Sequence, residues 1–164
     1  MQRRVVITGL GVVSPLGIGH QAFWSALLRG TSAVGPITRF DASGFATQIA
    51  AEVRDFDPTA YMDRKEARRN DRFVQFAYAA SRLALDDARY TITPSNAART
   101  GVLIGSGIGG ATTWEDQHRQ LMEHGPDRVS PFFVPMIITN MASGVTSILV
   151  GAKGPSSCVV TACA

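Results

Sequence analysis

Residues 100–110, TGVLIGSGIGG, join a short apolar run to four closely spaced glycines, and this junction decides the fold. The run around Val102 to Ile104 is typical of a buried strand, which we place at residues 100–104. Glycine follows at once and indicates a tight turn. Polar residues with helical periodicity come next and predict an amphipathic helix that ends near His124. The unit is therefore strand, glycine turn and helix.

The alternation continues on both sides of this unit. An apolar helix is expected over residues 136–149 and a last strand over residues 155–161. Upstream, residues 71–89 predict the longest helix, capped by Asn70 or Asp71. Its expected core stripe consists of Phe73, Phe76, Ala77, Ala80, Leu83 and Ala84.

The first part of the chain is more irregular. Residues 3–8 predict a strand that ends in a glycine turn at Gly9-Leu10-Gly11, and residues 21–29 predict a helix stopped by Gly30. Residues 31–58 and 125–135 are mostly loop, with one strand at 48–53. Strands and helices that alternate in this way favour a single α/β domain with a mostly parallel sheet covered on both faces.

Composition excludes several classes of protein. The 164 residues are 45% hydrophobic and 18% charged, which is typical of a compact domain and not of a disordered chain. The net charge of +3 is too small to indicate nucleic acid, and no apolar run approaches the roughly 20 residues of a membrane span. The only cysteines, Cys158 and Cys163, have no partners for a disulfide framework or a zinc site, so we expect a cytoplasmic protein without a metal.

The glycine stretch also matches G-x-G-x-x-G through Gly105, Gly107 and Gly110. A dinucleotide site would need an acidic residue about 20 positions further, at the end of a second strand. The nearest acids, Glu123 and Asp127, fall in a helix end and a loop. Close packing of a helix against a strand explains these glycines better than a cofactor does.

Cys163 directly follows Val159-Val160-Thr161-Ala162, the end of the last predicted strand. A thiol at the first turn of a helix lies near unpaired N–H groups and the positive end of the dipole, both of which favour the reactive thiolate. Most free cysteines are instead buried and structural, which is the role we expect for Cys158. These residues alone leave the role of Cys163 open.

Four ordered motifs together are more specific: RRVVITGLGVVSPLG at residues 3–17, GSGIGG at 105–110, SPFFVP at 130–135 and GPSSCVVTACA at 154–164. Along its whole length the chain resembles the β-ketoacyl-acyl-carrier-protein synthases, in the branch of bacterial fatty acid synthesis. The resemblance implies a thiolase-like fold of layered α/β halves. Residues 1–164 would be the N-terminal half, ending just after the nucleophile, with the C-terminal half absent.

The resemblance also implies a mechanism. Cys163 would take an acyl group from a carrier protein, and malonyl carrier protein would then lose carbon dioxide and attack that group. The backbone N–H of Cys163 would help to bind the oxyanion. The family's catalytic histidines and lysine belong to the second half, since His20, His118 and His124 are expected on the surface. We therefore expect no cofactor beyond the carrier's phosphopantetheine, and no turnover by these residues alone.

Further residues match the family's binding positions. Ile108 would be an apolar gate to the acyl pocket, which Ala162 would also line, and Phe133 and Val134 would reach the pocket of the partner subunit in a dimer. Ile108, Phe133 and Val134 could instead simply pack in a core. Residues 63–72, DRKEARRNDR, would place Arg64, Arg68 and Arg72 on one helical face. The resemblance assigns carrier docking to Lys65, Arg68, Arg69 and Arg128, whereas such a run is more often a solvated face. No aromatic residues are interleaved with these bases, so nucleic acid is a poor partner.

The leading hypothesis is thus a homodimeric, cytoplasmic condensing enzyme of fatty acid elongation. The alternatives are a polyketide-type ketosynthase of the same fold, a fragment that only docks or associates, and, least favoured, a dinucleotide-binding domain. Relatives that set chain length without catalysis lack the nucleophile, so the presence of Cys163 argues against them.

Overall fold

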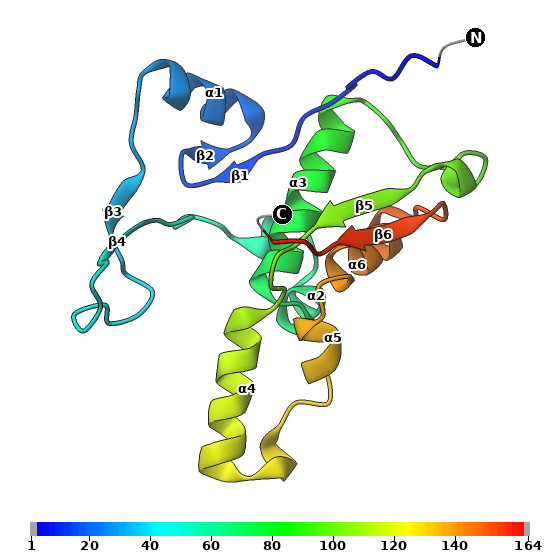
Figure 1. Ribbon diagram of the computed structural model, residues 1–164. Helices are drawn as coiled ribbons and strands as arrows, with labels where there is room; N and C mark the ends of the chain where they lie inside the picture. Colours follow the sequence, from blue (N-terminus) through cyan, green and yellow to red (C-terminus); the bar gives the residue numbers. More distant parts are fainter. Residues whose placement is uncertain (1–2, 163–164) are drawn as a thin grey trace.

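A computed structural model describes residues 3–162 (Figure 1). The strands are β1 (Val13–Ser14), β2 (Gly17–Ile18), β3 (Val34–Pro36), β4 (Ile49–Ala51), β5 (Val102–Gly105) and β6 (Ser156–Val159). The α-helices are α1 (His20–Leu28), α2 (Arg64–Arg69), α3 (Arg72–Asp87), α4 (Ala111–His124), α5 (Phe133–Ile137) and α6 (Met141–Val150). Short 3₁₀ helices are η1 (Pro58–Ala60), η2 (Ala97–Arg99) and η3 (Pro126–Arg128).

The two predicted strands beside the glycine motifs pair with each other in parallel. Val102 of β5 lies opposite Ser156 of β6, and Ile104 lies opposite Cys158. Parallel neighbours need a crossover between them, and α4, α5 and α6 form it (Figure 1). The mostly parallel sheet that the sequence predicted is found within residues 3–162 only as this one pair, in which Cys158 is half-buried beside Ile104.

The sequence predicted helices on both faces of the sheet, but within residues 3–162 only one face of the β5–β6 pair is covered. Helix α6 packs on one side of the β5–β6 pair, where Val102, Ile104 and Cys158 are half-buried. On the other side Leu103 is 68% exposed and Val159 is 48% exposed. The other sheets are antiparallel pairs, β1 with β2 and β3 with β4.

Helix α3 forms the centre of the fold. Its N-cap is Asp71, as predicted, and it packs against α6. Its fully buried residues are Val74, Tyr78 and Ala79, not the stripe expected from the sequence, which is only half-buried. Tyr78 belongs to a core cluster with Met62 and Ala67. The stripe is less buried because it faces the N-terminal segment rather than another helix.

The predicted strand at residues 3–8 is wrong for the described part of the chain. These residues are extended and exposed, without a ladder partner. A cavity of about 310 Å³ lies between Thr8–Gly9 and β5, so the segment does not pair with that strand. Instead it crosses α3, and the Leu10 N–H donates to Asp87 Oδ2 at 2.8 Å.

Gly9 and Gly11 serve this crossing and not the turn that the sequence predicted. A Cβ on Gly9 would lie 2.3 Å from the Ala84 carbonyl oxygen, and one on Gly11 would lie 1.8 Å from that of Ala80. Only glycine allows two backbones to approach so closely.

Other boundaries also differ from the sequence predictions. β4 was expected, but its partner β3 was missed because Gly35 and Pro36 are unfavourable in strands. The predicted loop 125–135 contains η3 and the start of α5. The apolar helix expected from residue 136 begins at Met141, because Ile138 is extended and separates α5 from α6.

Because the N-terminal segment crosses α3 at Gly11, Gly11→Ala should strongly destabilise the protein. The variant is made in the complete gene product, which is this chain together with any sequence that continues it. The added methyl group overlaps a helical carbonyl, so the free energy of unfolding should fall by about 1–3 kcal/mol. Chemical denaturation measures this. Gly44→Ala is the control, since a Cβ there has no neighbour within 4 Å. Equal stability of the two variants would contradict the crossing.

Candidate active site

The carboxyl ends of β5 and β6 meet at one edge, because the two strands are parallel. The pairing continues past β5, where the Ser106 N–H donates to the Val159 carbonyl at 3.1 Å. A Cβ on Gly107 would lie 3.8 Å from the Ala162 Cα. The glycine loop, residues 105–110, therefore runs beside the segment that leads to Cys163.

Cys163 itself lies outside the described residues. The residue before it, Ala162, is exposed and has a φ of 47°, in the left-handed region that alanine rarely adopts. Such backbone strain concentrates at functional turns. The chain thus leaves β6 through a strained turn immediately before the predicted nucleophile.

The glycine loop packs against the end of α5. A Cβ on Gly109 would lie 2.3 Å from the Ile137 carbonyl oxygen, and one on Gly110 would lie 2.3 Å from that of Met136. The Gly110 N–H donates to the Ile137 carbonyl at 3.1 Å. Close packing explains these glycines, as predicted, but the packing partner is α5 and not a strand.

Ile108 stands on this loop and is 79% exposed. It borders a mostly apolar hollow of about 440 Å³ between the loop, the first turn of α4 and the end of α5. The lining residues are Ile108, Gly110, Ala111, Trp114, Ile137, Ile138 and Thr139.

Of the predicted pocket residues, Ile108 lines this hollow, whereas Phe133, Val134 and Ala162 are not among its lining residues. The loop of Ile108 also runs past Ala162, so these two share one edge of the sheet. Phe133 packs on the hollow wall, with its ring 5.7 Å from that of Trp114. Val134 is exposed at the other end of α5 and does not line the hollow.

The basic run folds as two helices instead of one. Helix α2 is capped by Asp63, whose Oδ1 accepts the N–H groups of Lys65 and Glu66, and it ends at Asn70. Lys65, Arg68 and Arg69 are exposed on α2. The Arg69 guanidinium also lies over the Phe132 ring, 4.9 Å from its centroid.

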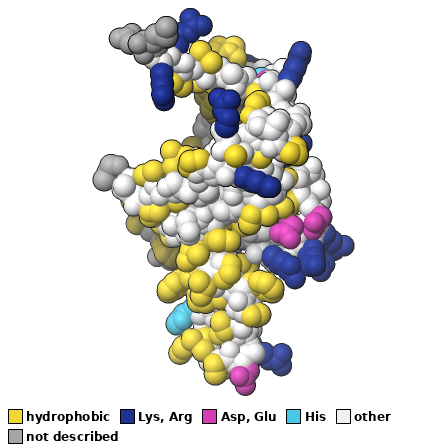
Figure 2. Space-filling model, turned by 90° about the vertical axis from the view of Figure 1, so that its right-hand side faces the viewer, with side chains coloured by type: hydrophobic (Ala, Val, Ile, Leu, Met, Phe, Trp, Pro, Cys, Tyr) yellow, Lys and Arg dark blue, Asp and Glu magenta, His cyan; other side chains and the backbone are white. Residues whose placement is uncertain are grey.

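Figure 2 shows Lys and Arg side chains gathered with acidic ones at the level of α2, and a smaller mixed group at the lower end of the molecule. η3, which contains Asp127 and the exposed Arg128, lies at that lower end. The predicted docking residues therefore do not form one continuous patch.

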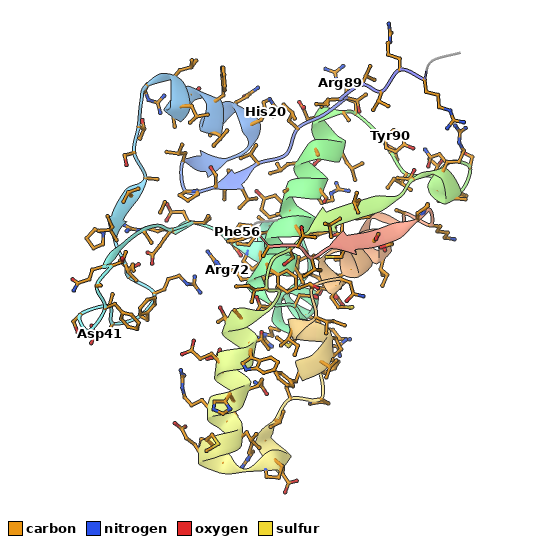
Figure 3. All side chains as sticks on the ribbon, viewed as in Figure 1. His20, Asp41, Phe56, Arg72, Arg89 and Tyr90 are labelled. Atoms are coloured by element: carbon orange, nitrogen blue, oxygen red, sulfur yellow. The ribbon has the colours of Figure 1, made fainter. Side chains whose placement is uncertain are left out.

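Arg72 does not share a face with Arg64 and Arg68, which corrects the sequence prediction. It starts α3 and lies over the rings of Phe56 and Phe76, at 5.6 and 4.6 Å (Figure 3). Its guanidinium donates to the Val53 carbonyl at 2.6 Å. Burial, together with the neighbouring Arg39, lowers the pKa of Arg72. Arg72 is a packing residue.

The histidines lie at the surface, as expected. His20 is near Asp87, with 3.8 Å between Nε2 and Oδ1, and His118 and His124 are exposed on α4. Within residues 3–162 no group of His, Cys, Asp and Glu is arranged to hold a metal ion. No helix in that range has the length and apolar character needed to cross a membrane.

Sequence reasoning missed one buried contact near the site. Asp71 was recognised only as a possible helix cap, yet its second carboxylate oxygen accepts two hydrogen bonds from Thr113, at the start of α4. No local sequence signal joins residues 42 positions apart.

The parallel strand ends, the glycine loop and the strained turn lie together at one edge of an α/β fold. Residues 2–164 match the family described as β-ketoacyl synthase, N-terminal domain, and the chain belongs to that family.

Its curated relatives are longer proteins. The chain is 54% identical to 3-oxoacyl-[acyl-carrier-protein] synthase 2 of Synechocystis over 163 residues, and 57% identical to that of Coxiella burnetii over 162 residues. Each match includes 99% of this chain but 39% of the relative.

Solved structures agree on the fold. The ishigamide ketosynthase/chain length factor matches all of this chain and 41% of its own, with a TM-score of 0.88 and 33% identity. A β-ketoacyl synthase from Burkholderia phymatum matches 98% of this chain and 40% of its own, with a TM-score of 0.76 and 26% identity.

The stacked position of Arg72 leads to a test. Arg72→Lys keeps the charge but loses the planar group that lies on two rings, so the free energy of unfolding should fall by about 1 kcal/mol. Arg68→Lys on the exposed face of α2 should leave it unchanged within about 0.5 kcal/mol. Urea denaturation of the complete gene product measures both. If Arg72→Lys were as stable as wild type, the packing role would be wrong.

Proposed function

We propose that the complete protein is a 3-oxoacyl-acyl-carrier-protein synthase of fatty acid elongation, and that residues 1–164 form the N-terminal half of its fold. The observation that supports this most is identity of 54% and 57%, over nearly the whole chain, to relatives with that name. In the sequence Cys163 follows the turn at Ala162 through which the chain leaves β6, and this suits the role of nucleophile.

In the proposed reaction the Cys163 thiolate attacks an acyl thioester, forms the acyl-cysteine bond and releases the carrier thiol. Malonyl carrier protein then loses carbon dioxide, and its carbanion attacks the acyl carbonyl and frees Cys163. Both attacks place negative charge on an oxygen, which the Cys163 N–H would stabilise. Decarboxylation would need two histidines and a lysine from the part of the protein beyond residue 164. No cofactor is required beyond the carrier's phosphopantetheine.

The acyl chain would pass Ile108 and Ala162. Ile108 is suited to act as a gate because it is exposed on a loop beside an apolar hollow. Phe133 would support the wall through Trp114. Val134 is exposed, and we assign it to the pocket of a second subunit in a homodimer.

The exposed apolar surface supports dimer formation. Figure 2 shows apolar side chains gathered over the region of α5 and its neighbours. The exposed residues there include Phe132, Val134 and Ile138. Large exposed apolar patches mark interfaces more often than free surface.

The proposed partner is an acidic acyl carrier protein in the cytoplasm, docked at Lys65, Arg68 and Arg69, with Arg128 as a separate contact. One solved relative is a type II polyketide acyl-carrier protein in complex with its ketosynthase, which matches this chain with 25% identity and a TM-score of 0.76. Opposite charges would steer the encounter, mainly by raising its rate.

A polyketide-type ketosynthase is the second candidate, because a ketosynthase/chain length factor and the ketosynthase of a type II polyketide complex share the fold. Their identities of 33% and 25% are well below the 54% and 57% of the fatty acid relatives. The fatty acid function is therefore preferred.

Acylation of Cys163 is the direct test. After incubation of the complete gene product with an acyl carrier thioester, intact mass should rise by one acyl group in wild type and Cys158→Ala, but not in Cys163→Ala. An adduct that survives Cys163→Ala would refute the assignment of the nucleophile. A wild-type protein without any adduct would indicate a docking or association function instead.

Charge reversal tests the docking surface. Arg68→Glu should lower kcat/KM for carrier-borne acyl groups by about tenfold at low salt, and less at high salt. The rate with a carrier-free thioester should not change, since that substrate makes no contact with α2. Arg29→Glu, at the exposed end of α1, is the control. An equal loss with both substrates would show damage to the fold and not to docking.

A further inference from the structure

One buried carboxylate joins the starts of two helices. Asp71 is 7% exposed and Thr113 is 6% exposed. Asp71 Oδ1 accepts the Phe73 N–H at 3.2 Å and so caps α3. Its Oδ2 accepts the Thr113 N–H at 3.0 Å and the Thr113 hydroxyl at 2.6 Å. The carboxylate is therefore bonded on both sides.

Helix α4 needs this external acceptor. Its N-cap is Gly110, which has no side chain to accept an N–H of the first turn. Glycine is required there because any Cβ would meet the Met136 carbonyl oxygen. Thr113 is the third residue of α4, and its N–H is one that an N-cap side chain normally satisfies. Asp71 supplies the acceptor that Gly110 lacks.

The position of Asp71 connects the two parts of the proposed site. On one side it follows Asn70, the C-cap of α2, and Gln75 of α3 holds the end of α2 by donating to the Ala67 and Asn70 carbonyls at 2.8 and 2.9 Å. On the other side it holds the first turn of α4, where Ala111 and Trp114 form a wall of the hollow beside Ile108.

We propose that Asp71 is a positioning residue that caps α3 and α4 with one carboxylate and thereby sets the shape of the hollow beside Ile108. This inference rests on the proposed function, because it takes the hollow to hold the acyl chain. Loss of the contact to Thr113 lets the first turn of α4 move, which changes which acyl chains fit. The contact thus determines acyl chain-length preference and not only stability.

The test compares Thr113→Val with Thr112→Val in the complete gene product. Both changes replace a hydroxyl by a methyl group, but Thr113 is buried against Asp71 whereas Thr112 is exposed. A third variant, Asp71→Ser, keeps a short acceptor for the cap of α3 and cannot reach Thr113. Amide hydrogen exchange of the first turn of α4 and the ratio of Cys163 acylation rates with hexadecanoyl and octanoyl carrier-free thioesters are measured.

Exchange in the first turn of α4 should be about tenfold faster in Thr113→Val and Asp71→Ser than in wild type, because a hydrogen bond to a charged group is lost. The ratio of acylation rates should shift about tenfold in the same variants and stay constant in Thr112→Val.

Faster exchange with an unchanged ratio would overturn the positioning role and leave Asp71 a structural cap. Unchanged exchange in Asp71→Ser, which loses the acceptor of the Thr113 N–H, would overturn the double cap itself. Absence of acylation in wild type would instead refute the proposed function, and exchange alone would then decide whether Asp71 caps both helices, since it needs no substrate.

Discussion

The parallel pairing of β5 with β6 is the constraint on which the rest of the structure depends. Ile104 lies opposite Cys158 and Gly105 opposite Val159, so both strands end at one edge of the sheet. That edge holds the glycine loop, residues 105–110, and the turn at Ala162, which are far apart in the sequence. The crossover that parallel strands require places α4 and α5 beside the same edge. The pairing thus brings the hollow and the segment that leads to Cys163 to the same edge.

The close approach of backbones is a second constraint on the fold, and it excludes side chains at several positions. Gly11 lets the N-terminal segment cross α3, and Gly109 and Gly110 let the loop pack on α5. Each glycine removes a side chain that could have capped or filled space. At Gly110 the missing group is a helix cap, which Asp71 replaces from another part of the chain. One sequence constraint therefore explains why a carboxylate is buried next to the site.

Local signals predicted most of the elements around the site. The apolar run and glycines gave β5, helical periodicity gave α3 and α4, and the β-branched run gave β6. Ile108 and Ala162 were assigned to one pocket only through the family resemblance, and the structure places their segments at the same edge. Prediction failed where the structure depends on a distant partner: residues 3–8 lack a strand neighbour, β3 contains Gly35 and Pro36, and Arg72 is held by Phe56 and Phe76. The contact between Asp71 and Thr113 has no local signature either.

We propose that the edge where β5 and β6 end is an acyl-binding site with Cys163 as its nucleophile. A crystal structure of the complete gene product, after reaction with a carrier-free hexadecanoyl thioester, tests it most directly. The account predicts an acyl group bonded to the Cys163 sulfur, with its chain passing Ile108 into the apolar hollow. An unmodified Cys163, or an acyl chain bound away from the glycine loop, would contradict it.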